Sequence, residues 1–110
     1  MEDMFFGNSK LTSLDLSSFE TGQVTNMMSM FSYCESLAHL NIVHFDFNKV
    51  TNIARLFSGC KSLSSLIFTK FNTNNVYRMD SVFEDCAKLK SIDLSTFVTK
   101  EKKSNPTVAL

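Results

Sequence analysis

The sequence predicts an α/β solenoid in which strand–helix repeats stack, with a parallel sheet on one face and helices on the other. Three consecutive stretches of 26 residues support this prediction: 11–36, 37–62 and 63–88. Each stretch has alternating apolar residues in its first half and apolar residues three or four positions apart in its second half. Such a unit cannot bury its own apolar face, so neighbouring copies must stack against each other.

The first half of each repeat predicts a short strand. Its central apolar residues are two positions apart, which is the period of a strand with one buried face. The pattern L-x-x-L-x-L-x-x-F occurs at Leu11, Leu14, Leu16 and Phe19, and its later copies are Leu37, Leu40, Ile42, Phe45, then Leu63, Leu66, Phe68, Phe71, then Leu89, Ile92, Leu94, Phe97.

The second half of each repeat predicts a helix. Its apolar residues lie at relative offsets of 0, 3, 6, 7 and 10. On a helix these offsets form a single stripe that could face the core. The three stripes are Val24, Met27, Met30, Phe31, Cys34, then Val50, Ile53, Leu56, Phe57, Cys60, then Val76, Met79, Val82, Phe83, Cys86.

Partial units flank the three full repeats. Residues 1–10 match the second half of a repeat, and residues 89–99 match the first half, so the predicted solenoid spans residues 1–99. Residues 100–110 lack the pattern and are expected to form a polar tail or a partial cap. The last strand would then leave an open end, through which we expect weak self-association of the chain.

Composition and cysteine spacing exclude several classes of function. The 110 residues carry eleven basic and eleven acidic side chains, whereas nucleic-acid binding requires a positive surplus. No apolar run is long enough to span a membrane, and the chain shows no signal peptide. Cys34, Cys60 and Cys86 occur once per repeat, which gives a column of buried thiols rather than a tetrahedral metal site. We therefore expect no metal and no cofactor.

The outward positions of the predicted strands form the candidate binding surface, on the concave sheet face. Most of these residues are small and polar, but Ile67 and Val43 are apolar. Outward apolar residues are typical of a partner-binding patch, and also of variation on a half-exposed sheet. The candidate protein-binding residues are His39, Asn41, Val43, Ser65, Ile67 and Thr69.

The same residues give little support for catalysis. His39 and His44 are expected on opposite faces of the strand segment, so they cannot converge on one site. Ser13, His39 and Asp15 could approach each other on neighbouring strands, but no motif supplies an oxyanion hole or a pocket. We therefore expect a non-enzymatic protein with no catalytic residues.

The recurring string Met30-Phe31, Cys34, Leu37, Leu40, Ile42 and Phe45 resembles the BspA-like class of leucine-rich repeats. More narrowly, it is similar to a repeat domain of unknown function found in bacterial surface lipoproteins. The resemblance implies a right-handed leucine-rich-repeat solenoid, cell-surface or extracellular display, and adhesion or protein binding. We expect a protein-binding segment of a larger surface protein, with a host surface protein as a candidate ligand. A structural spacer or an intracellular scaffold without a ligand is the alternative.

Overall fold

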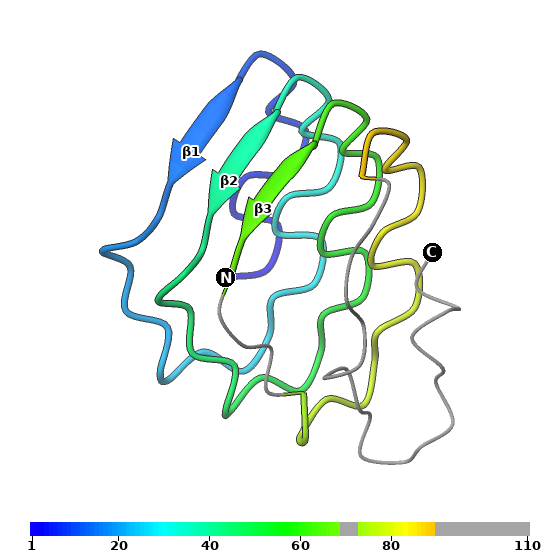
Figure 1. Cartoon of the computed structure of the whole chain (residues 1–110). Coiled ribbons are helices and arrows are strands. Elements are labelled where there is room, and N and C mark those ends of the chain that lie inside the picture. The colour runs from blue at the N-terminus through cyan, green and yellow to red at the C-terminus, as the bar shows by residue number, and fades with distance from the viewer. Residues whose placement is uncertain (69–72, 90–110) are drawn as a thin grey trace.

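A short parallel sheet joins successive rungs of the chain in the computed structural model, which describes residues 1–68 and 73–89. The strands β1 (Ser13–Asp15), β2 (His39–Asn41) and β3 (Ser65–Ile67) lie side by side in the order β1-β2-β3 (Figure 1). Their register pairs residue 13 with residue 39 and residue 39 with residue 65. Neighbouring rungs are therefore offset by 26 residues along the chain.

The expected helices are absent from residues 1–68 and 73–89, so the prediction of an α/β solenoid with a helical face is wrong. The chain opposite the sheet instead forms consecutive β-turns. The N–H of Met30 donates to the carbonyl of Met27 at 3.2 Å, and Ser29 between them has a φ of 56°. A positive φ at the third residue is the requirement of a type II turn. Other residues with positive φ are Asp3, Gly7, Tyr33, Arg55, Gly59, Ser81 and Asp85.

Hydrogen bonds between rungs explain why helices do not form here. The N–H of Ser29 donates to the carbonyl of Ala54, and that of Phe31 donates to Leu56, both at 3.0 Å. Alternate N–H groups of the turn segment thus bond to the next rung, while those between them close the turns. Rungs bonded in this way are ~5 Å apart, the spacing of neighbouring strands. An α-helix is about 10–12 Å wide and would not fit within that spacing.

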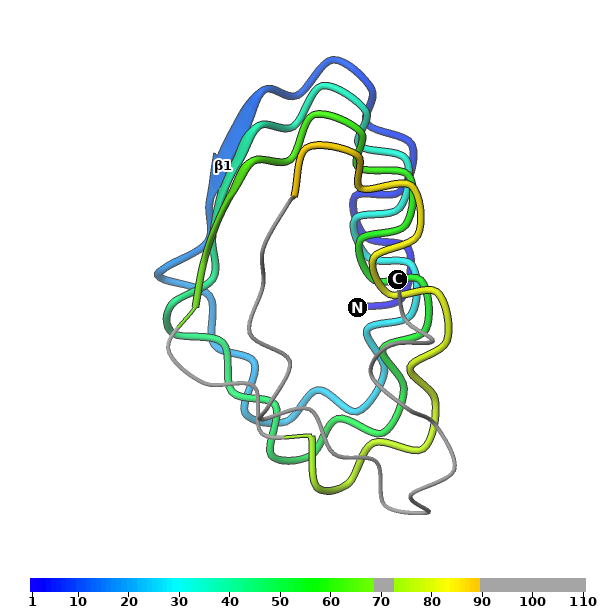
Figure 2. The same cartoon turned by 45° about the vertical axis from the view of Figure 1, so that its right-hand side comes forward.

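Apolar side chains fill the space between the sheet and the turns, which face each other when the stack is seen from the side (Figure 2). Phe5, Phe31, Phe57 and Phe83, which we call the phenylalanine ladder, stack one above another. Their ring centroids are 5.5, 5.6 and 5.6 Å apart, with interplanar angles of 3°, 6° and 12°. Each interior ring therefore contacts a ring above and a ring below, which couples the rungs.

The cysteine column lies beside the phenylalanine ladder. Cys34 and Cys60 are buried, as predicted, and Cys86 is half-buried. Each thiol lies 3.1 Å from the carbonyl of the ladder phenylalanine in the preceding rung, to which it donates. Burial raises the pKa of all three thiols, that of Cys86 to about 11. At neutral pH the thiols are therefore protonated and are poor nucleophiles or metal ligands.

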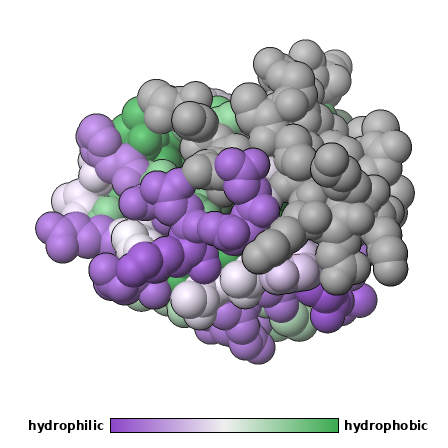
Figure 3. Space-filling model, turned by 90° about the horizontal axis from the view of Figure 1, so that it is seen from below, coloured by the Kyte–Doolittle hydropathy of each residue, from purple (hydrophilic) through white to green (hydrophobic). Residues whose placement is uncertain are grey.

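The surface of the described part is mostly polar where it can be seen from below, with a smaller group of hydrophobic atoms (Figure 3). The segments that connect the sheet to the turns expose polar side chains, such as Gln23, Asn48 and Lys49. In the described ranges, no helix is long and apolar enough to cross a membrane. The expected open end and tail lie beyond residue 89, outside the described residues.

Candidate functional site

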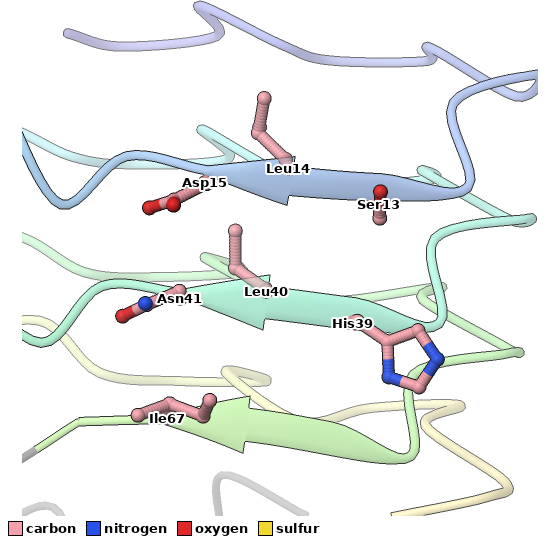
Figure 4. A pocket seen from close by; sticks show the side chains of 7 residues that line it. All are labelled: Ser13, Leu14, Asp15, His39, Leu40, Asn41 and Ile67. Atoms are coloured by element: carbon pink, nitrogen blue, oxygen red, sulfur yellow. The ribbon is translucent and has the colours of Figure 1, made fainter.

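The outer face of the three-stranded sheet carries a shallow depression of about 170 Å³, which we call the sheet depression (Figure 4). It lies between two columns of outward side chains that the parallel register brings together. Small-molecule pockets are usually about 300–1,000 Å³, so this depression is smaller than a typical small-molecule site. The residues that line it are Ser13, Leu14, Asp15, His39, Leu40, Asn41 and Ile67.

Three of the six residues predicted to bind a protein line this depression: His39, Asn41 and Ile67. Ser65 pairs with His39 in the sheet and is half-buried, but it does not line the depression. Val43 is half-buried and follows the end of β2.

The remaining predicted residue, Thr69, lies outside the described residues. The prediction did not include Ser13 and Asp15, which β1 contributes to the depression. Both occupy outward positions of the same strand pattern. The repeat register was sufficient to find them, because it places them beside His39 and Asn41.

Side-chain hydrogen bonds hold Asp15 and Asn41 in place at the ends of their strands. These two residues are neighbours in the same column of outward side chains. Oδ1 of Asp15 accepts the N–H of Ser17 at 2.9 Å, and Oδ1 of Asn41 accepts the N–H of Val43 at 3.0 Å. These are Asx turns, in which the side chain replaces a main-chain acceptor. The hydrogen bonds from Ser17 lower the pKa of Asp15, so its carboxylate is charged at neutral pH.

Ile67 breaks the polar character of this column. It is in register with Asn41, which is in turn in register with Asp15. Half of the Ile67 side chain is exposed (50%), and an isoleucine cannot accept the hydrogen bond that closes an Asx turn. The column therefore presents a carboxylate, an amide and an apolar side chain on three successive rungs.

The structure also brings Ser13, His39 and Asp15 to the same depression. The hydrogen bonds of the described residues do not link these three side chains, and Oδ1 of Asp15 is occupied by the N–H of Ser17. Figure 4 shows the ring of His39 directed away from Asp15. The arrangement therefore lacks the connected nucleophile, base and orienting carboxylate of a catalytic triad.

Comparison with known proteins assigns the chain to a family. Residues 1–40 and 32–107 match the family model described as "Mycoplasma protein of unknown function, DUF285". The chain belongs to the DUF285 family. No curated protein and no solved structure matches the chain.

The two matched stretches of the DUF285 chain overlap, and together they include all three strands of the sheet. The sheet depression therefore lies within the family domain. The description of the DUF285 family names no activity, so it assigns no role to these residues.

Proposed function

We propose that the DUF285 chain is a non-enzymatic protein-binding segment of a larger surface protein, and that it holds its ligand on the outer face of the sheet. The exposed side chain of Ile67, which lines the sheet depression, is the observation that carries this proposal. An apolar side chain among polar neighbours is typical of the centre of a protein interface, where it is covered by the partner. The three hydrogen-bonded strands provide the base for such contacts.

The surface location and the adhesive role rest on the resemblance of the repeats to BspA-like surface repeats. Under this proposal the ligand is a protein, and a protein of a host cell surface is the first candidate. The small volume of the sheet depression supports contact through single side chains rather than capture of a small molecule.

A pull-down from a host-cell surface extract tests this proposal. The variant Ile67→Lys places a charge in the depression without affecting an Asx turn, whereas a change at Asn41 would remove the acceptor for Val43. Met4→Lys is a matched control, because Met4 is also 50% exposed but lies outside the sheet. We expect a protein that binds the wild type and Met4→Lys but not Ile67→Lys. Equal capture by all three forms would refute the role of this surface.

A structural spacer is the second candidate, and the continuous hydrogen bonding between rungs favours it. A spacer needs a regular stack but no ligand, so it should tolerate any folded variant of the outer sheet face. If no protein is captured and Ile67→Lys has the stability of the wild type, the spacer function gains support.

A further inference from the structure

We propose that the sheet depression of the DUF285 chain binds a basic side chain, arginine or lysine, of the partner protein. This inference rests on the proposed function, because it names the group that the same surface would recognise. Asp15 and Ile67 supply two different contacts for such a side chain, and Asn41 supplies one for the main chain of the partner residue. Each contact follows from the geometry already described.

The carboxylate of Asp15 provides the charge complement. Asp15 is exposed, and the N–H of Ser17 holds it in place at 2.9 Å. Among residues 1–68 and 73–89, the ion pairs are Lys61–Glu35 and Arg78–Asp80, and neither involves Asp15. The carboxylate therefore has no ion-pair partner within the described part of the chain. A cation from a partner would neutralise a charge that no ion pair of the described residues compensates.

Ile67 provides the surface for the aliphatic part of the same side chain. Two rung spacings separate it from Asp15, which corresponds to about 10 Å. Arginine and lysine commonly lay their methylene groups along apolar surface while the charged end stays in contact with water or a carboxylate. A partner residue above Ile67 and Asn41 would direct its charged end toward Asp15.

Asn41 lies between these two residues and provides a hydrogen-bond donor. The N–H of Val43 occupies its Oδ1, which identifies Nδ2 as the remaining polar atom of the amide. That Nδ2 makes no hydrogen bond with the described residues. It can therefore donate to a main-chain carbonyl of the partner.

Nuclear magnetic resonance can test the preference for a basic group. The probes are a blocked glycine-arginine-glycine tripeptide and the same peptide with citrulline, which is similar in shape but uncharged. The methyl groups of Ile67 and the side-chain amide of Asn41 report binding. We expect saturable shifts at both residues, and binding of the arginine peptide about two- to fivefold tighter, the range of an exposed ion pair.

Two variants test whether Asp15 causes the preference for the arginine peptide. Asp15→Asn keeps the acceptor of the Asx turn and removes the charge, so both peptides should then bind equally. Glu20→Gln removes an exposed carboxylate that does not line the depression, and should leave the preference unchanged. Equal binding of both peptides to the wild type would overturn the inference. A protein that binds the wild type and Asp15→Asn but not Ile67→Lys would also overturn the inference. The proposed function would then still stand.

Discussion

Replacing Phe57 by leucine should lower the free energy of unfolding more than the same replacement at the end of the phenylalanine ladder. Phe57 is fully buried, and its ring stacks on Phe31 and on Phe83 at 5.6 Å in each case. One stacked aromatic pair contributes about 0.5–1.5 kcal/mol beyond its buried area, so loss of two pairs should cost about 1–3 kcal/mol. The cavity left by the smaller side chain adds to this cost.

Phe5→Leu is the matched control for this change. Phe5 is half-buried and stacks only on Phe31 among the described residues, so its replacement should cost about 0.5–1.5 kcal/mol for the single pair. The free energy of unfolding can be measured with urea and followed by circular dichroism. A double-mutant cycle of Phe31→Leu with Phe57→Leu then isolates the pair from the loss of buried area. A coupling energy near zero, or equal costs at Phe57 and Phe5, would refute the role of the ladder.

Three further predictions concern the turns and the thiols. Gly59→Ala should destabilise the chain more than Gly7→Ala. Both changes should lower the free energy of unfolding by about 1–2 kcal/mol, because φ is positive at both glycines. At Gly59 the added Cβ would also lie 2.6 Å from a ring atom of Tyr33, whereas at Gly7 it would meet no atom within 4 Å. Equal unfolding free energies of the two variants would exclude this contact. Cys60 should react with a thiol reagent at pH 8 only after urea is added, and rapid labelling of the folded chain would contradict its burial. The free energy of unfolding should fall as the pH rises from 9 to 11. The thiol of Cys86 has a pKa of about 11 in the folded chain, whereas in the unfolded chain its pKa is 9.0, so over this range the thiol ionises more readily when unfolded. The fall should be smaller in Cys86→Ala.

The parallel sheet was predictable because its signal is local and simple. Leu14 and Leu16 alternate with polar residues, and the next repeat has the same alternation at Leu40 and Ile42. A period of two admits few structures other than a strand. The equal repeat length then places corresponding strands side by side, as the register shows.

The turns were not predictable from the same kind of pattern. Met27 and Met30 are three residues apart, which is typical of one face of a helix. The first and last residues of a β-turn have the same separation, and in the structure these two residues close such a turn. What distinguishes such a turn from a helix is its third residue, which requires a positive φ. At Gly59 the residue type itself indicates a positive φ. At Arg55 and Tyr33 it does not, because such residues rarely adopt this conformation.

The candidate site was only partly predictable. Ile67 stood out because an apolar residue occupies an outward position of the strand pattern. The importance of Asp15 depends on two facts that the sequence does not contain: its hydrogen bond to Ser17, and the absence of an ion-pair partner among the described residues. Both facts depend on the arrangement of side chains in space.

The register of the sheet has a consequence for how genes of this kind can change. Each rung returns to its starting position after 26 residues, and the hydrogen bonds on both sides of the stack depend on that return. An insertion of a few codons within the stack would shift the strands and the turns out of register together. A duplication or deletion of 26 codons would add or remove one rung and leave every other contact between rungs in place. Length variation among such genes is therefore expected in whole multiples of 26 codons, and comparison of gene lengths between strains would reveal it.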